Sequence, residues 1–322
     1  MLLAELAVRA FSDGLPEAPP AWGLWETQDK LAVIDRLAGR GGADVVLIGS
    51  SMMEVAADPA RISLALGRTR PVFNAAVLGA TSRMFAWWAD EIVVPRLRPS
   101  TVVIGVGSRE VNDNGASFVF DTTRSSRGAK IATGRAGFLD RLNEVAAEWS
   151  YLVRYRSVLR KPYSLFAGDP VADFVGQRIQ VTDLGAPRDI RRLAPETYEV
   201  RKAFRDAVGS RAYRDFSVGG RELEALSHLV ARLRSLRIEV VLVKMPVTED
   251  AIRLHPRGMV DYRAFDRAIE AFAEDRGLQL LDLDTPFGDL DEFSDPHHLN
   301  SRGRARFTEL LAAHLARLPA SR

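Results

Sequence analysis

Five short apolar runs, separated by stretches with helical periodicity, constrain the fold of this chain more than any other feature of its sequence. Most of the runs are rich in β-branched residues and nearly continuous rather than alternating. Such runs are typical of parallel strands that are covered on both faces. The expected strands are residues 45–49, 72–76, 101–107, 238–245 and 278–284.

Helical patterns fill most of the spaces between these runs. The last one places Phe307, Leu311 and Leu315 on a single face, as an amphipathic helix does. Strands that alternate with helices predict an α/β protein with a parallel sheet between two helical layers, a three-layer α/β/α sandwich. The expected helices are residues 60–66, 82–97, 221–236, 262–276 and 303–318.

The stretch from about residue 118 to residue 216 breaks this rhythm. Residues 120–216 contain 18 Lys and Arg against 12 Asp and Glu, a local net charge of +6. The stretch is too long for a plain loop. We therefore expect an N-terminal docking segment of residues 1–40, followed by an α/β domain of residues 41–322. Within that domain, residues from about 118 to 216 are expected to form a mostly helical, basic insertion. The insertion fits a solvated basic surface, a lid, or a site for an anionic partner.

Composition excludes several classes of protein. The 44 basic and 42 acidic side chains leave a net charge of only +2, which gives no general case for nucleic-acid binding. The absence of cysteine excludes disulfides, thiolate catalysis and cysteine-based zinc sites. No stretch reaches the roughly 18 apolar residues of a membrane span. Residues 1–11 lack the order of a signal peptide, so a cytoplasmic protein is expected, with an exported or anchored form left open.

Polar residues follow several of the expected strands. The carboxyl ends of parallel strands meet at one edge of an open sheet, and ligands bind beyond that edge. We therefore expect these groups to gather at a single rim. They are Ser50 and Ser51 after the first strand, Gly79 after the second, Ser108 and Arg109 after the third, and residues 295–298 after the fifth.

Ser51 stands where the first expected strand gives way to a helix that begins near Met52. A hydroxyl at this point is exposed, and the start of a helix favours nearby negative charge. A nucleophile could therefore work here. The alternative is that Ser50 or Ser51 only caps the helix.

Asp295 and His298 lie three residues apart, just before the last helix. A turn that begins at Asp295 brings the imidazole of His298 back beside the carboxylate and leaves its other nitrogen for a serine. Two alternatives stay open, because Asp295 followed by Pro296 also resembles a helix cap, and His297 is a rival for the histidine role. The other histidines are interpreted as structural, on helices, or as loop surface: His228, His314 and His255.

Together these pieces resemble the SGNH (GDSL-type) hydrolases over roughly residues 40–318, apart from the 118–216 region. The matching motifs are Gly49-Ser50-Ser51, a glycine after the second strand, a turn after the third, and a late Asp-x-x-His-Leu-Asn. The resemblance implies a flavodoxin-like five-stranded parallel sheet and a catalytic triad. It assigns the nucleophile to Ser51, the histidine to His298 and the aspartate to Asp295, with Gly79 as a backbone donor to the oxyanion.

The chain departs from the family at the third oxyanion donor, which is an asparagine side chain in a Gly-x-Asn-Asp block. That block falls on residues 107–110, where Arg109 stands in the asparagine position, and Asn112 and Asn114 are close by but shifted. Arg109 or Ser108 could donate to the oxyanion instead. The alternative is that Arg109 pairs with a neighbouring carboxylate and never reaches the site.

The resemblance therefore predicts a serine-dependent ester hydrolase or O-acyltransferase that forms an acyl-enzyme on Ser51. The expected partner is a small-molecule or carbohydrate ester such as an acylated sugar, with no metal or organic cofactor. The competing hypothesis is a catalytically impaired binding or scaffold protein with the same fold. A nucleotide-binding protein is disfavoured, because residues 49–51 provide neither a Gly-x-Gly-x-x-Gly fingerprint nor a P-loop lysine. The sequence does not give the oligomeric state, and it does not distinguish an ester hydrolase from an acyltransferase.

Overall fold

The computed structural model divides the chain into two compact units, which are described separately. The helical unit comprises Met1–Asp29 and Asp121–Ile179, and the sheet unit comprises Lys30–Phe120 and Gln180–Arg322. Every candidate site residue belongs to the sheet unit. Much of the expected insertion, at 161–178, 194–197 and 199–211, lies outside the described residues. The structure describes residues 2–15, 18, 20–67, 71–115, 118–160, 179–193, 198, 212–285 and 287–318.

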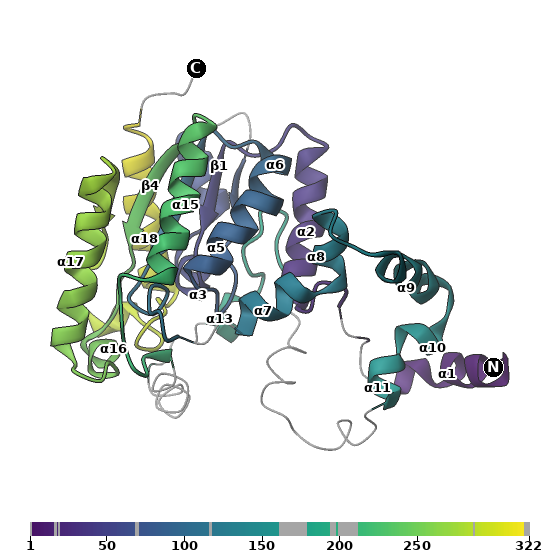
Figure 1. Ribbon diagram of the computed structural model, residues 1–322. Helices are drawn as coiled ribbons and strands as arrows, with labels where there is room; N and C mark the ends of the chain where they lie inside the picture. The colour runs from purple at the N-terminus through teal and green to yellow at the C-terminus, as the bar shows by residue number, and fades with distance from the viewer. Residues whose placement is uncertain are drawn as a thin grey trace. The chain divides into compact units, whose positions relative to one another are not determined.

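The sheet unit contains a five-stranded, fully parallel sheet in the order β2-β1-β3-β4-β5 (Figure 1). This is the flavodoxin-like order, in which the chain first adds a strand on one side of β1 and then extends the sheet on the other. The predicted fold class is confirmed, and all five expected strands are present. The strands are β1 (Val45–Ile48), β2 (Val72–Asn74), β3 (Thr101–Val106), β4 (Glu239–Lys244) and β5 (Gln279–Asp282).

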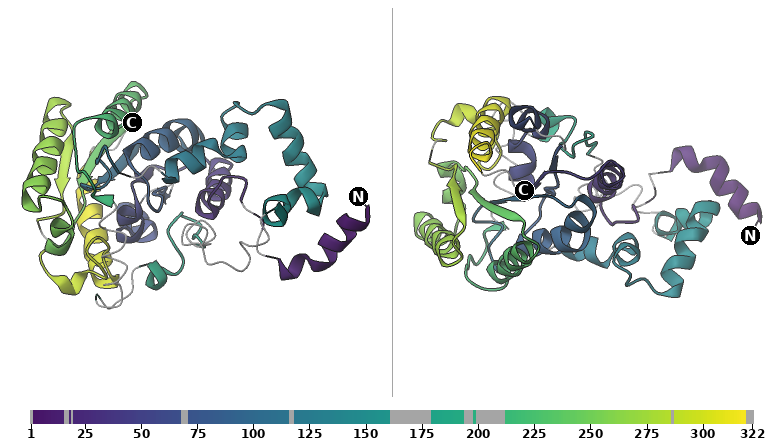
Figure 2. Two further views of the ribbon diagram at one scale, coloured as in Figure 1. Left: turned by 60° about the horizontal axis from the view of Figure 1, so that its bottom comes forward. Right: turned by 90° about the horizontal axis from the view of Figure 1, so that it is seen from above.

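Helices cover both faces of the sheet, as the continuous burial of the central strands requires. All residues of β1 and β3 are buried. Helix α15 packs on α5 and β4 on one face, and α18 packs on α3 and α4 on the other (Figure 2). These helices and α17 are α3 (Ser51–Ala56), α4 (Pro59–Leu66), α5 (Ser82–Trp88), α15 (Arg221–Ser235), α17 (Met259–Asp275) and α18 (Ser301–Leu315).

The helix expected at residues 82–97 contains a wider turn. Helix α5 continues through a π-helical segment, Ala89–Val93, into α6 (Val94–Leu97). The backbone N–H of Val94 donates to the carbonyl of Ala89, five residues back, and Pro95 follows directly. Proline has no N–H to donate and its ring crowds the preceding turn, so a local widening accommodates it without ending the helix.

The described part of the helical unit contains helices and no strand. Helix α1 is held by the carboxylate of Glu5, which accepts hydrogen bonds from the backbone N–H groups of Tyr151 (2.6 Å) and Leu152 (3.1 Å) at the start of α10. The Tyr151 bond is the main reason that the pKa of Glu5 is lowered. The helices wholly within the unit are α1 (Leu2–Phe11), α8 (Arg127–Ala132), α9 (Phe138–Trp149), α10 (Tyr151–Arg154) and α11 (Arg156–Arg160).

A fully buried ion pair in the sheet unit ties helix α2 (Trp25–Ala38) to α3. The Nζ atom of Lys30 lies 2.9 Å from Oε1 of Glu54, and both side chains are 0% exposed. Lys30 also donates to the carbonyl of Ala76, just after β2. Asn74 adds a hydrogen bond from its side-chain amide to the carbonyl of Glu54 (3.3 Å). These bonds hold α3, whose first residue is Ser51, against the segment that follows β2.

We predict that Lys30→Met lowers the free energy of unfolding by about 3–5 kcal/mol, because it removes the ammonium group that pairs with the buried Glu54 carboxylate. Denaturant unfolding curves measure this loss. The double variant Lys30→Met/Glu54→Leu should recover most of it. As a matched control, Arg253→Met removes an exposed partner of Glu249 and Asp250 and should cost less than about 1 kcal/mol. A similarly small loss for Lys30→Met would contradict the prediction.

Candidate active site

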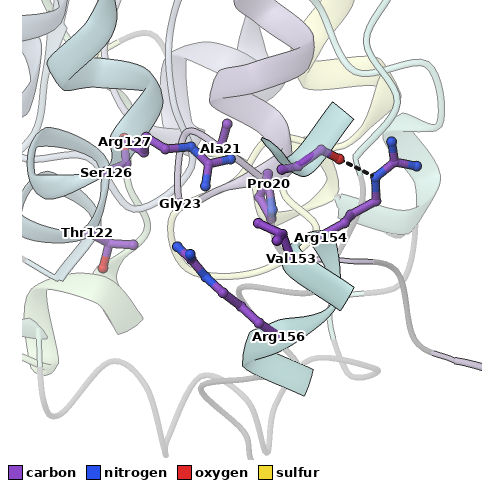
Figure 3. Close-up of a pocket in the computed structure, with 10 residues that line it drawn as sticks. Pro20, Ala21, Gly23, Thr122, Ser126, Arg127, Val153, Arg154 and Arg156 are labelled. Carbon is purple, nitrogen blue, oxygen red and sulfur yellow. Dashed lines mark hydrogen bonds between the residues drawn. The ribbon is translucent and has the colours of Figure 1, made fainter. Parts of the chain in front are cut away.

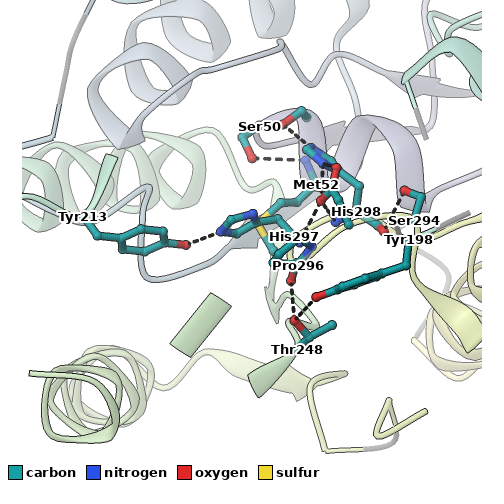
Figure 4. A network of polar contacts seen from close by, with 11 residues as sticks. Ser50, Met52, Tyr198, Tyr213, Thr248, Ser294, Pro296, His297 and His298 are labelled. Carbon is teal, nitrogen blue, oxygen red and sulfur yellow. Dashed lines mark hydrogen bonds and ion pairs between the residues drawn. The ribbon is translucent and has the colours of Figure 1, made fainter. Parts of the chain in front are cut away.

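The turn between β1 and α3 separates the roles of two adjacent serines. Ser50 is the N-cap of α3, and its hydroxyl accepts a hydrogen bond from the backbone N–H of Met52 (3.2 Å) (Figure 4). Ser51 is the first residue of the helix. Gly49 is required before them, because a Cβ atom there would lie 2.6 Å from Cβ of Met53. The capping role therefore falls on Ser50 and leaves the hydroxyl of Ser51 available for another contact.

The structure brings Ser51, His298 and Asp295 together in one line of hydrogen bonds. Oγ of Ser51 lies 2.8 Å from Nε2 of His298, and Nδ1 of His298 lies 2.8 Å from Oδ2 of Asp295. A carboxylate only accepts hydrogen bonds, so Nδ1 carries the proton and Nε2 presents its lone pair to the serine hydroxyl. Ser51 and His298 therefore meet although they are 247 residues apart in the sequence, and the carboxylate of Asp295 orients the histidine.

The turn at residues 295–298 is organised by the carboxylate of Asp295. Its Oδ1 atom accepts the backbone N–H groups of His297 (2.9 Å) and His298 (3.0 Å), as in an Asx turn. Burial acts to raise the pKa of Asp295, but the neighbouring His298 and the backbone bonds lower it below its usual value. The cap of α18 is Asn300, whose side chain accepts the N–H groups of Arg302 and Gly303. The alternative that Asp295 caps the last helix is therefore wrong.

His297, the rival histidine, faces Tyr213 instead of the serine (Figure 4). Its Nε2 atom lies 2.8 Å from the Tyr213 hydroxyl, and the two rings are stacked with centroids 5.7 Å apart. Burial lowers the pKa of His297 to about 3, so the ring is neutral near pH 7. The geometry thus favours His298 as the base and gives His297 a different set of partners.

Two backbone N–H groups that follow β1 and β2, at the carboxyl edge of the sheet, are free to donate. Gly79 lies in the turn after β2 with φ +72°, and Ser51 is the first residue of a helix, where N–H groups have no partner within the helix. Among the described residues neither N–H group has a hydrogen-bond acceptor. Both donors predicted from the family resemblance are therefore unoccupied.

In the turn after β3, the side chains of Arg109 and Ser108 both contact other side chains of the protein. The guanidinium of Arg109 pairs with Oε1 of Glu110, with Nη2 at 2.8 Å, and the other oxygen of Glu110 accepts the N–H of Gly107. The hydroxyl of Ser108 lies 3.0 Å from Nε2 of His255. The pairing of Arg109 with a neighbouring carboxylate is the alternative that the sequence left open.

The two shifted asparagines anchor the segment that begins at residue 212. The side-chain amide of Asn112 donates to the carbonyl of Ala212 (3.1 Å), and that of Asn114 donates to the carbonyl of Asp215 (2.6 Å). This segment carries Tyr213. The sequence contained no signal for that contact, because the partners are about 100 residues apart.

His255 corrects one prediction. It was expected at the surface beside Pro256, but its side chain is buried with only 4% exposed, and its ring packs 4.3 Å from the ring of Tyr213. Tyr213 is 1% exposed. Both residues border the candidate site, Tyr213 through His297 and His255 through Ser108, and the sequence predicted a place at the site for neither.

The helical unit has a separate hollow of about 260 Å³ lined by three arginines (Figure 3). Arg127 bonds to Glu144, and Arg156 donates to the side chain of Asn143 (2.6 Å). Arg154 donates to a carbonyl of α9 at 3.0 Å. These bonds connect α8 and α9 with α10 and α11 inside the unit.

In the parts of the chain that the structure describes, no helix is long and apolar enough to cross a bilayer. Those parts also contain no group of three or more His, Asp or Glu side chains arranged to hold a metal ion.

Comparison with known proteins gives remote similarities in structure. No family model and no curated protein matches the chain. A lipase/acylhydrolase from Enterococcus faecalis is similar at 12% identity over 85% of this chain and 95% of that one, with a TM-score of 0.43. A GDSL-like lipase from Bacteroides thetaiotaomicron is similar at 14% identity over 88% and 98%, with a TM-score of 0.40. At this level of similarity the comparisons carry no argument about activity, which rests on the contacts of Ser51, His298 and Asp295.

Proposed function

We propose that this protein is a serine-dependent ester hydrolase or O-acyltransferase of the SGNH (GDSL-type) superfamily. The observation that supports this most is the unbroken line of hydrogen bonds from Ser51 through His298 to Asp295. A serine, a histidine base and an orienting carboxylate are the parts of an activated oxygen nucleophile. A scaffold protein has no need to keep all three groups in contact.

In the first step, Oγ of Ser51 attacks the carbonyl carbon of the ester while Nε2 of His298 accepts the hydroxyl proton. The ionised Asp295 holds the imidazole in the correct tautomer and stabilises its cation. His298 then returns the proton to the oxygen of the leaving alcohol as the tetrahedral intermediate collapses. The acyl group remains on Ser51 as an ester.

The negative charge on the tetrahedral intermediate requires hydrogen-bond donors. The backbone N–H groups of Ser51 and Gly79 are the donors that we propose, because neither has an acceptor among the described residues. Nε and Nη2 of Arg109 already bond to Glu110, and the hydroxyl of Ser108 is already in contact with Nε2 of His255. A third donor from Ser108 therefore requires that its hydroxyl leave His255 when substrate binds.

The acyl group leaves Ser51 when a second hydroxyl attacks with His298 as the base. Water completes hydrolysis, and an alcohol such as a sugar hydroxyl completes acyl transfer. Both outcomes use the same acyl-enzyme. The proposed substrate class is a small or carbohydrate ester, and no step requires a metal or an organic cofactor.

A fluorophosphonate probe tests the nucleophile. We expect the wild-type protein to be labelled and Ser51→Ala to show no labelling, because the probe reacts with a serine activated by a base. Ser50→Ala is the matched control, since it removes the neighbouring hydroxyl and should keep labelling. Equal labelling of the wild type and Ser51→Ala, or no labelling of the wild type, would contradict the assignment of Ser51 as the nucleophile.

The pH dependence of kcat/KM for a simple acetate ester tests the base. The pKa of His297 is about 3 and that of Asp295 is below its usual value, so neither group changes charge above about pH 5. We therefore expect that activity, as it falls with decreasing pH, falls with the uptake of one proton and not two. A fall that requires two protons would show that His297 titrates in this range.

Substitution of individual histidines then identifies the residue that acts as the base. His298→Ala should lower kcat by roughly 10³-fold or more, because it removes the base that activates the serine. His228→Ala, at an exposed position of helix α15, is the matched control and should keep nearly full activity. An active His298→Ala together with an inactive His297→Ala would reverse the assignment of the two histidines.

A further inference from the structure

Helix α9 of the helical unit is amphipathic, but its apolar side is exposed. The helical period places four large apolar side chains within about 60° of one another around the helix axis. These four residues, the α9 stripe, are Phe138, Leu142, Val145 and Trp149. Phe138 and Trp149 are 78% and 79% exposed, and the other two are more than half exposed. An amphipathic helix of a globular protein normally turns such a stripe towards the core.

The polar side of α9 carries its hydrogen bonds to α8 and α11. The side chain of Glu144 bonds to Arg127 of α8, and that of Asn143 accepts a hydrogen bond from Arg156 of α11 (2.6 Å). Glu144 and Asn143 lie roughly 100° or more from the α9 stripe around the helix. The helix is therefore fixed in its unit through its polar side. The stripe is left as an exposed apolar surface of the kind that marks an interaction site.

The spacing of the α9 stripe fits a second helix of the same sequence. Its residues follow one another at intervals of four, three and four, which is the heptad spacing of helices that pack together. These intervals read the same in both directions along the helix. A two-fold axis through the middle of the stripe therefore superposes the stripe on itself in reverse order. Phe138 then faces Trp149 of the second copy, and Leu142 faces Val145 of the second copy.

The charged residues beside the stripe favour the same arrangement. Arg141 and Glu148 are both exposed and lie along one edge of the stripe, and neither side chain has an ion pair among the described residues. An antiparallel pair brings these two edges together, so that Arg141 of each copy faces Glu148 of the other. A parallel pair would instead place this edge beside the opposite one, which carries the apolar Leu139 and Ala146.

We propose that the α9 stripe is the contact surface for a second copy of this chain, with the two α9 helices antiparallel about a two-fold axis. An anionic lipid surface would also cover apolar side chains, but it attracts a helix edged with basic residues, and Glu148 opposes it. The inference goes beyond the proposed chemistry and does not depend on it. Two short helices bury less surface than a standard stable interface, so we expect a reversible dimer that forms as the protein concentration rises.

Sedimentation velocity of the full chain at increasing concentration tests the dimer. We expect the wild type to dimerise and Leu142→Asp to remain monomeric, because the substitution places a carboxylate in the apolar contact. Leu64→Asp, at an exposed position of α4, is the matched control and should dimerise as the wild type does. A wild type that stays monomeric up to about 1 mM would overturn the proposal, whether or not it binds anionic vesicles. Equal dimerisation of Leu142→Asp would also overturn it.

Charge reversal tests the orientation. Arg141→Glu replaces two attractions with two repulsions in the antiparallel pair and should weaken the dimer by about tenfold. The double variant Arg141→Glu/Glu148→Arg restores both attractions and should recover the association of the wild type. Failure of the double variant to recover would overturn the antiparallel pairing.

Cross-linking tests the orientation independently, because the chain contains no cysteine. Phe138→Cys and Trp149→Cys chains that are mixed and then oxidised should form a disulfide-linked dimer, since the two positions face each other across the axis. Either variant alone should remain unlinked, because each position is displaced from its own copy by roughly 16 Å along the helix, beyond the reach of a disulfide. Linking of one variant to itself as fully as in the mixture, or no linking in the mixture, would overturn the proposal.

Discussion

The parallel pairing of β1 with both β2 and β3 is the constraint on which the rest of the sheet unit depends. Because the three strands run in one direction, Ser51, Gly79 and Ser108 follow their carboxyl ends at the same edge. The pairing of β4 and β5 extends that edge to the loop that carries Asp295 and His298. Residues far apart in the chain therefore lie close together, because each of them follows the end of a strand at the same edge of the sheet.

The features that the sequence predicted correctly are those set by local pattern. Continuous β-branched runs indicated the buried parallel strands, since each run carries its own evidence of burial on both faces. The Asp295–His298 contact was predictable for a related reason, because a three-residue spacing in a turn brings a carboxylate and an imidazole together. The contact of Ser51 with His298 required one additional assumption, the shared edge of a parallel sheet.

The features that escaped prediction depend on contacts between distant segments. Nothing local in the sequence indicates that Lys30 and Glu54 form a buried pair, because charged residues of this kind are usually exposed. His255 beside Pro256 has a sequence typical of a surface loop, but in the structure its ring packs against the ring of Tyr213. The division of the chain near residues 29 and 120 likewise follows from packing between segments that are distant in the sequence.

The separation of roles between Ser50 and Ser51 has a consequence for the electrostatic field at the hydroxyl of Ser51. An aspartate in the position of Ser50 would also cap α3, but it would add a full negative charge one residue from Ser51. Ser50 caps with a neutral hydroxyl. The partial positive charge of the N–H groups at the start of α3 is then not offset by a permanent anion beside the hydroxyl of Ser51.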